Sequence, residues 1–365
     1  RNGEYTMTPF PREDYRPLRP YDPGRSPIAV DLTDNTNLWG PHPAALEVVR
    51  QAPPEALTRY PSVYGSDLKE ALAAKFGVPT GNIATGCGSD DLMDSIFRAS
   101  TLPPGRMSFP SPSFSMVPVF AIMNGLEPSP VPWAKAETDP ARLLLDEPDL
   151  VYLCRPNNPT GLSLGRDWIL ALLALGGPDG PLVILDEAYA DFGDDSFLSD
   201  APSTDRLLVL RTFSKLYGLA GLRVGYAVGP ETLIKEAEKS RGPYKMGYVA
   251  ERAAVAAIED TSGWADGKRK ETRENRERLI HELRHRGLQP LPSEGNFVLI
   301  PVEPASAVGV NQALRERGVA GRPFPNLPEI GDALRVTVGP WDLMERFLEA
   351  LDGLFEATNY EGGPT

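Results

Sequence analysis

Three short apolar runs along the chain predict buried strands of a parallel sheet. They cover residues 149–154, 182–185 and 207–210, and each is apolar at nearly every position. Helical spacing over residues 167–174 separates the first two runs. Strands that alternate with helices form βαβ units, in which the strands run parallel and end at one edge of the sheet. The pattern therefore predicts an α/β fold.

Helical and strand patterns also precede and follow this predicted sheet. Before it, we expect helices over residues 43–51 and 67–76, and a third helix that opens near Gly88. Residues 102–133 hold many prolines between aromatic residues, which predicts short strands joined by turns. Beyond residue 228 the predicted order is helices 231–240, 249–259 and 263–287, strand 296–301, helix 305–317, strand 333–338 and helix 341–354.

This order divides the chain into three parts. Residues 1–40 form an extended arm, because the prolines at positions 17, 20 and 23 exclude a helix there. Residues 41–243 form a larger domain around the predicted parallel sheet, and residues 244–365 form a smaller α+β domain. A chain of 365 residues is long enough to bury two such cores.

The composition narrows the class of protein. A formal net charge of −13 argues against nucleic acid and against anionic membranes as partners. No run of 18 apolar residues occurs, and the first residues lack the apolar core of a signal peptide, so a cytoplasmic protein is expected. With two cysteines far apart and three histidines, neither a disulfide framework nor a metal site is expected.

Polar side chains follow the three predicted strands, at the edge where open α/β sheets bind ligands. They are Asn158, Asp186 with Tyr189, and Ser214 with Lys215. A partly desolvated lysine loses its proton more easily and becomes a nucleophile, and Arg223 could bind a phosphate beside it. The alternative is a solvated lysine and an arginine that pairs with a surface acid. The convergence of three strand ends favours a site.

A glycine-containing turn over residues 86–91 is a second candidate for ligand binding. Glycines ahead of a helix let an anion approach exposed backbone N–H groups, and the helix dipole favours its charge. The alternative is that the Ser89 hydroxyl caps the helix, with Asp90 and Asp91 in its first turn. The turn by itself leaves both interpretations open.

Nine short motifs, taken in order, give the chain a resemblance to a known family. They are Pro20-Tyr21-x-Pro-Gly, Asn37-x-x-Gly40, Arg59-Tyr60-Pro61, Gly86-x-Gly88-Ser89-Asp90, Pro112-Ser113-Phe114, Asn157-Asn158-Pro159-Thr160-Gly161, Asp186-Glu187-Ala188-Tyr189, Ser214-Lys215 with Arg223, and Leu334-Arg335-Val336-Thr337-Val338-Gly339. The series extends over nearly the whole chain. It resembles the fold-type-I enzymes that use pyridoxal 5′-phosphate, specifically the class I and II aminotransferases, and within them the histidinol-phosphate aminotransferase branch.

The resemblance implies a fold and an assembly. The fold is the type I fold of pyridoxal-phosphate-dependent transferases, with a mainly parallel seven-stranded sheet in the large domain and a smaller α+β domain at the C-terminus. The assembly is a homodimer, in which the arm packs on the small domain and on the partner subunit. In such a dimer Tyr60 reaches the cofactor phosphate of the neighbouring subunit.

The resemblance also implies roles around the cofactor. Lys215 forms a Schiff base with it and then moves the substrate α-proton, while Asp186 keeps the pyridine nitrogen protonated. Tyr189 and Asn158 hydrogen-bond the phenolic oxygen of the ring. Phe114 stacks on the ring, at a position where the family often has tyrosine. The residues implied to bind the phosphate are Gly88, Ser89, Asp90, Thr212, Ser214 and Arg223.

Substrate contacts are implied in the same way. Arg335 resembles the arginine that binds the substrate α-carboxylate, and Arg322 resembles a second arginine that meets a substrate phosphate. Further residues implied to lie near the substrate are Tyr21, Asn37, Gly40 and Asn158. Lys245 replaces a residue that is small and polar in many relatives. It favours an acidic side chain on the substrate if it faces the cleft, and it has no such role if it faces solvent.

The implied activity is transfer of an amino group to and from 2-oxoglutarate by two half-reactions, with histidinol phosphate as the favoured donor. An aromatic amino acid is the close alternative. A decarboxylase of the phosphothreonine type and an oxidase share the motifs, because fold and cofactor do not fix which bond breaks. A regulator that binds the cofactor as a ligand would need a basic helix-turn-helix segment, and the sequence contains none.

Overall fold

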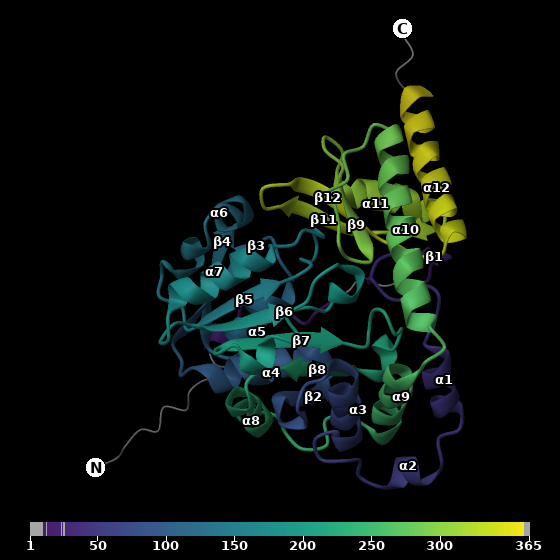
Figure 1. The fold of residues 1–365 in the computed structure, drawn as a ribbon. Helices are drawn as coiled ribbons and strands as arrows, with labels where there is room; N and C mark the ends of the chain where they lie inside the picture. Colours follow the sequence, from purple (N-terminus) through teal and green to yellow (C-terminus); the bar gives the residue numbers. More distant parts are fainter. Residues whose placement is uncertain (1–9, 12, 23, 25, 361–365) are drawn as a thin grey trace.

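The computed structural model describes residues 10–11, 13–22, 24 and 26–360, which form a larger and a smaller unit (Figure 1). The larger unit is built on a seven-stranded sheet of order β2-β8-β7-β6-β5-β3-β4. Its strands are β2 (Ile83–Cys87), β3 (Gly105–Ser111), β4 (Leu126–Pro132), β5 (Leu150–Cys154), β6 (Leu182–Asp186), β7 (Leu207–Thr212) and β8 (Val224–Val228). Strand β8 runs antiparallel to both neighbours and the other strands are parallel, which confirms the predicted α/β sheet.

Helices cover both faces of this sheet. Alternate residues of each strand point to opposite faces, so Val151 and Leu153 of β5 join one apolar core while Leu150 and Tyr152 join the other. Burial on both faces explains why these strands read as continuous apolar runs. The helices of the larger unit are α1 (Pro43–Arg50), α2 (Glu55–Thr58), α3 (Ser66–Phe76), α4 (Gly88–Ser100), α5 (Met116–Met123), α6 (Trp133–Thr138), α7 (Arg166–Gly176), α8 (Glu231–Ser240) and α9 (Tyr248–Glu259).

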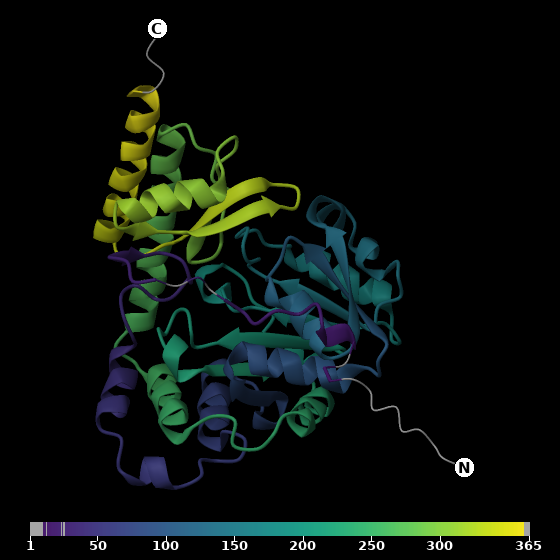
Figure 2. The ribbon, with the colours of Figure 1, turned by 180° about the vertical axis from the view of Figure 1, so that it is seen from behind.

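The smaller unit surrounds a three-stranded antiparallel sheet of order β11-β12-β9. Its elements are α10 (Trp264–His285), β9 (Phe297–Pro301), α11 (Ala307–Glu316), β10 (Val319–Ala320), β11 (Arg322–Leu327), β12 (Gly331–Thr337) and α12 (Trp341–Tyr360). From behind, α10 is seen to continue from the larger unit into the smaller one (Figure 2). No helix among the described residues is both long and apolar enough to cross a membrane.

The N-terminal segment joins the smaller unit before the chain enters the larger one. Strand β1 (Val30–Asp31) pairs in parallel with β10, and Val30 and Leu32 are buried in the apolar core of the smaller unit. Three residues later the segment reaches the carboxyl edge of the large sheet, where the carbonyl of Asp34 accepts a hydrogen bond from Nζ of Lys215.

Two connections differ from the sequence-based expectation. The interval 102–133 was expected to hold only strands and turns, but helix α5 lies between β3 and β4. Its proline, Pro118, is the third residue of the helix, and the first helical turn tolerates proline because its N–H groups have no partner within the helix. Between β6 and β7 the chain forms only short 3₁₀ turns, Ala190–Phe192 and Ala201–Ser203, where a helix had been expected.

Helix α9 bears on where the two domains divide. The expected boundary at residues 243–244 places α9 in the smaller domain, whereas α9 packs against α1 and α3 and contributes to the core of the larger unit. We propose that the division falls beyond α9, within α10. The apolar residues of α10 that join the core of the smaller unit, among them Leu279 and Leu283, lie in its second half.

Candidate active site

A cavity of about 570 Å³ lies at the carboxyl edge of the seven-stranded sheet. Strands β5, β6 and β7 all end there, as their sequence predicted, and the smaller unit supplies the opposite wall. The predicted site residues that line the cavity are Tyr21, Ser89, Asp90, Phe114, Asn158, Asp186, Tyr189, Thr212, Ser214, Lys215, Arg223, Arg322 and Arg335. A second hollow, of about 710 Å³, lies at the other end of the strands and shares no residue with the first.

Lys215 follows β7 and projects into the cavity. Its Nζ atom donates a hydrogen bond of 3.2 Å to the carbonyl of Asp34 and lies 5.4 Å from the centre of the Tyr189 ring. Desolvation in the cavity, and then the positive charge of Arg335, lower the pKa of Lys215 to about 8. Near neutral pH about a tenth of this amine is therefore neutral, far more than of an ordinary lysine, and available as a base or nucleophile.

Asp186 ends β6 and is 4% exposed. Its Oδ2 atom accepts a hydrogen bond of 2.7 Å from the hydroxyl of Tyr152, and its Oδ1 atom accepts one of 3.0 Å from the backbone N–H of Ala188. Burial raises the pKa of Asp186 to about 6, against the lowering effect of these two donors. The group is thus a carboxylate near neutral pH.

Tyr189 and Arg335 face Lys215 from the other sides of the cavity. The Tyr189 hydroxyl accepts a hydrogen bond of 3.1 Å from the side chain of Asn35, and its ring meets Phe297 edge-on at 5.0 Å. Arg335 donates to the side chain of Asn158 and, at 2.6 Å, to the carbonyl of Thr33. Its buried Nε atom has no hydrogen-bond partner among the described residues. Such an unsatisfied cationic donor is a ready site for an anionic group.

The N-terminus of α4 offers a second place in the same cavity where an anion could bind. Gly88 has φ +79°, and a Cβ atom at Gly225 would come within 2.4 Å of the Ser89 backbone nitrogen, so both positions require glycine. Cys87 directly precedes the helix at its N-cap position, and its backbone N–H donates a hydrogen bond of 3.1 Å to the Asp91 carboxylate. The helix has no side-chain cap, so the interpretation of Ser89 as its cap is not supported, and the anion site stays a prediction.

Hydroxyl and guanidinium groups surround this helix terminus. Thr212 Oγ1 lies 2.9 Å from Ser214 Oγ and accepts a hydrogen bond from the Ser214 backbone N–H. Arg223 adopts a left-handed backbone conformation with φ 52°, which turns its guanidinium toward Asp90 at 3.4 Å. Burial raises the pKa of Asp90, while the charge of Arg223 opposes that rise. The set can bind a phosphate through hydroxyl, backbone N–H and guanidinium donors.

Four of the predicted residues do not line the cavity. Gly88 lies directly behind it, at the start of α4. Asn37 and Gly40 stand behind the loop that carries Lys215, where the Asn37 amide donates to the carbonyl of Leu216 at 2.7 Å and Gly40 packs against Gly218. Tyr60 is 84% exposed, with its ring 4.8 Å from that of Tyr244.

Lys245 faces away from the cavity as well. Its Nζ atom forms an ion pair of 2.9 Å with Asp91, near the start of α4. The alternative in which Lys245 selects an acidic substrate therefore has no support from its position. No group of three or more His, Cys, Asp and Glu side chains within the described part of the chain could hold a metal ion.

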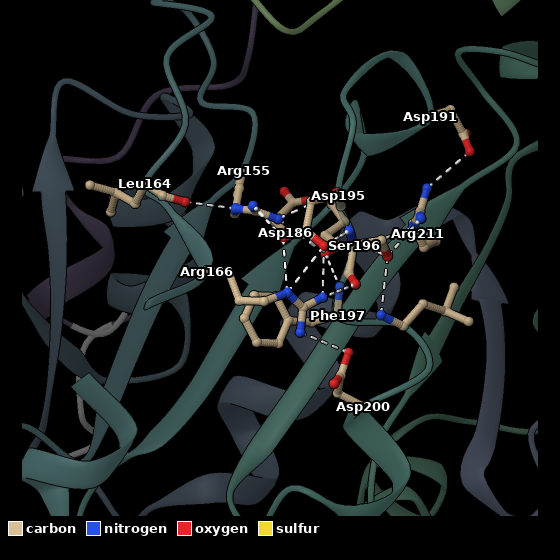
Figure 3. Close-up of polar contacts among 12 residues, drawn as sticks. Arg155, Leu164, Arg166, Asp186, Asp191, Asp195, Ser196, Phe197, Asp200 and Arg211 are labelled. Atoms are coloured by element: carbon tan, nitrogen blue, oxygen red, sulfur yellow. Dashed lines mark hydrogen bonds and ion pairs between the residues drawn. The ribbon is translucent and has the colours of Figure 1, made fainter. Parts of the chain in front are cut away.

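A buried charged network fixes the strand ends from behind the cavity (Figure 3). Glu187 is fully buried and accepts hydrogen bonds from the Ser196 hydroxyl and the Phe197 backbone N–H. Arg211 of β7 pairs with Glu187 at 3.1 Å, and Arg155, which follows β5, pairs with Asp195 at 2.9 Å. Glu187 thus links the ends of the neighbouring strands β6 and β7.

Some residues of the cavity were absent from the sequence-based set. Asp34 and Thr36 line it because the arm crosses the edge of the sheet, and only the structure reveals that crossing. Tyr152 lies directly behind Asp186. Tyr152 and Cys154 project from the same face of β5, and the pairing of Cys154 with Asp186, which brings the Tyr152 hydroxyl to the carboxylate, is a property of the folded sheet. In the sequence, Tyr152 resembles an ordinary core aromatic.

The fold and the cavity together define an α/β protein with an amine, a carboxylate and two anion-binding sites at the carboxyl edge of its sheet. The model of the family "Aminotransferase class I and II" matches residues 27–351. Histidinol-phosphate aminotransferase 2 of Archaeoglobus fulgidus is 35% identical over 347 residues, which cover 93% of this chain and 99% of that protein. Histidinol-phosphate aminotransferase 1 of Bradyrhizobium diazoefficiens is 37% identical over 342 residues, covering 92% and 96%.

Solved structures agree with these relatives. The crystal structure of histidinol-phosphate aminotransferase from Sinorhizobium meliloti, in complex with pyridoxal 5′-phosphate, superposes with a TM-score of 0.84 at 27% identity. The match covers 97% of this chain and 100% of that one. The chain belongs to the class I and II aminotransferases.

Proposed function

We propose that this aminotransferase binds pyridoxal 5′-phosphate in the cavity and moves an amino group between histidinol phosphate and 2-oxoglutarate. The observation that carries the proposal is Lys215, an amine whose pKa is lowered to about 8, in one cavity with the carboxylate of Asp186. The curated relatives named above support the amino donor, and the Sinorhizobium meliloti complex supports the cofactor. We further propose that the enzyme acts as a cytoplasmic homodimer.

The donor set of the cavity fits this cofactor. The α4 N-terminus with Ser89, Ser214 and Arg223 would hold its phosphate. At the other end of the cofactor, the Asp186 carboxylate would hold a proton on the ring nitrogen. Lys215 would attach to its aldehyde group. Each of these groups is complementary in charge or hydrogen bonding to the part of the cofactor that it would meet.

When bound, the cofactor supplies an electron-accepting ring that stabilises negative charge at the substrate α-carbon. Within the chain, Lys215 removes and returns the proton at that carbon, and its lowered pKa makes this possible near neutral pH. Tyr189 and Asn158 orient the ring oxygen, and the flat face of Phe114 excludes water from one side. Arg335 binds an anionic group of the substrate, with its unpartnered Nε among the donors.

A spectroscopic experiment tests the proposed activity. Protein loaded with pyridoxal 5′-phosphate is mixed separately with glutamate, histidinol phosphate and phenylalanine. We expect glutamate and histidinol phosphate each to bleach the yellow colour, and 2-oxoglutarate to restore it. Faster bleaching by phenylalanine would indicate an aromatic aminotransferase. Release of carbon dioxide or consumption of oxygen would indicate a decarboxylase or an oxidase. A protein that takes up no cofactor would overturn the proposal.

Arg335→Lys is expected to lower kcat/KM for glutamate about a hundredfold, because lysine lacks the planar fork that binds a carboxylate through two hydrogen bonds. Single-turnover bleaching by glutamate measures the effect. The matched control is Arg269→Lys, which alters an exposed arginine paired with Asp266 on α10. If both variants react with glutamate as the wild type does, Arg335 is not the carboxylate-binding residue.

An exposed apolar cluster supports the proposed dimer. Its centre is Tyr60, 84% exposed, whose ring lies 4.8 Å from that of Tyr244, and the Tyr244 N–H donates to the carbonyl of Val63. Leu57 and Tyr248 are exposed apolar residues close to this group in the sequence. Contiguous apolar surface of this kind marks protein interfaces. A second copy would cover it and bring Tyr60 to the neighbouring cavity.

Subunit mixing tests the placement of Tyr60. Tyr60→Ala is expected to weaken cofactor binding at least about tenfold, because it removes a hydrogen bond to a charged phosphate. Lys215→Ala should be inactive. A dimer formed from one subunit of each variant retains one complete site, so unfolding and refolding an equal mixture should restore about a quarter of wild-type activity. Activity is measured at a cofactor concentration that saturates the wild type but not Tyr60→Ala, and if the mixture is no more active than the average of its two components, Tyr60 does not act across the interface.

A further inference from the structure

Tyr152 is a fully buried residue whose hydroxyl donates a hydrogen bond to Asp186 and also lies beside the Cys154 thiol. It lies on β5 with no exposed surface, does not line the cavity, and donates its O–H to Oδ2 of Asp186 at 2.7 Å. That distance is typical of a charge-assisted bond from a hydroxyl to a carboxylate. Burial and the nearby Asp186 raise the pKa of Tyr152 well above its ordinary value, so its hydroxyl keeps its proton at every working pH.

We propose that Tyr152 is a positioning residue that keeps Asp186 ionised and directs its remaining lone pairs into the cavity. The backbone N–H of Ala188 holds the other carboxylate oxygen, so the two donors fix the plane of the group. A carboxylate that already accepts a hydrogen bond attracts a further proton less strongly. The proton shared with the cofactor ring would therefore stay on the ring nitrogen. This inference rests on the proposed role of Asp186.

The other ionisable groups around Asp186 do not replace this donor. Cys154 of β5 and Tyr189, three residues beyond β6, are both held neutral by raised pKa values. Asp90 of α4 raises the pKa of Asp186 through its negative charge, while Lys215 lowers it. Of these influences, the hydrogen bond from Tyr152 is the largest that opposes protonation. A variant that lacks only this hydroxyl isolates its effect.

The test variant is Tyr152→Phe, which removes the hydroxyl and keeps the ring in the core. Without cofactor, the pKa of Asp186 is measured by NMR of ¹³C-labelled aspartate carboxyls, with Asp186→Asn identifying the signal. We expect the pKa of Asp186 to rise by about one to two units, the loss that a hydrogen bond to a charged group predicts. The matched control is Tyr226→Phe, which removes the hydroxyl of a buried tyrosine on β8 outside the cavity.

A second readout uses the loaded enzyme. The ¹⁵N shift of labelled cofactor reports whether the ring nitrogen carries the proton. We expect a protonated ring in the wild type and in Tyr226→Phe, a neutral ring in Asp186→Asn, and a shift toward the neutral value in Tyr152→Phe. If Tyr152→Phe matches the wild type in both measurements, the inference is overturned.

These measurements distinguish an error in the proposed role of Asp186 from an error in the proposed role of Tyr152. If Asp186→Asn leaves the ring nitrogen as it is in the wild type, Asp186 does not hold the ring proton and the proposed site is wrong. The titration without cofactor would still report whether Tyr152 governs the ionisation of Asp186. If the ring proton depends on Asp186 but not on Tyr152, the site stands and Tyr152 is only a packing residue.

Discussion

Lys215→Ala is expected to lower the rate of amino transfer by at least about 10⁴-fold. The cavity lining, as far as the structure describes it, holds no second lysine, so no neighbouring amine can replace this one. The fold should persist, because the hydrogen bond that Nζ makes goes to a single backbone carbonyl. Single-turnover reaction with glutamate measures the loss.

Borohydride reduction followed by peptide mass spectrometry provides an independent check on Lys215. We expect the cofactor to be attached to the peptide that contains Lys215 in the wild type and to no peptide in Lys215→Ala. The matched control, Lys239→Ala, removes an exposed lysine paired with Glu236 on α8 and should retain full activity. Substantial turnover by Lys215→Ala, or attachment of the cofactor at another lysine, would contradict the assignment.

Asp186→Asn is expected to lower kcat about 10³-fold, since it preserves the shape of the side chain and removes the charge that stabilises the ring proton. The same substitution should stabilise the protein without cofactor at neutral pH. Burial raises the pKa of Asp186 from 3.8 to about 6, so the folded state holds this proton more tightly than the unfolded chain. The contribution of protonated Asp186 to the stability of the wild type is complete below pH 3.8 and is lost as the pH rises through 6, so the advantage of Asp186→Asn appears over the same range.

Urea unfolding of both proteins without cofactor measures this effect. Between pH 4 and pH 7 the wild type should lose about 2 kcal/mol of unfolding free energy relative to Asp186→Asn. The comparison uses the change with pH, so any constant difference between the two side chains cancels. A parallel pH dependence in both proteins would mean that Asp186 titrates normally. If Asp186→Asn retains its activity, Asp186 has no role in the reaction.

The elements that the sequence predicted best are the strands that are buried on both faces. Strands β5, β6 and β7 are covered on both faces, so they are apolar throughout and were found by their runs, together with the polar residues at their ends. Helix α5 was missed because Pro118 suggested a turn, although proline is tolerated in a first helical turn. The packing of α9 depends on contacts with α1 and α3, far away in sequence, and no local pattern reports them.

The residues of the candidate site also fall into two groups, those that local sequence indicates and those that only long-range contacts reveal. Lys215, Asp186 and Arg335 lie at strand ends or on strands, so local sequence placed them. Asp34 and Asn35 reach the cavity through long-range contacts with Lys215 and Tyr189, which a single sequence does not display. Tyr152 illustrates a further limit. Its ring belongs to the core and its hydroxyl to the site, and the apolar pattern records only the first property.

The N-terminal arm connects the smaller unit to Lys215 in the larger unit. Strand β1 belongs to the smaller unit, yet the carbonyl of Asp34 binds Nζ of Lys215 and the side chain of Asn35 binds Tyr189. The backbone of Asn35 is itself tied to Thr337 of β12. A change in the position of the smaller unit would therefore be passed directly to the side chains of Lys215 and Tyr189 through Asp34 and Asn35.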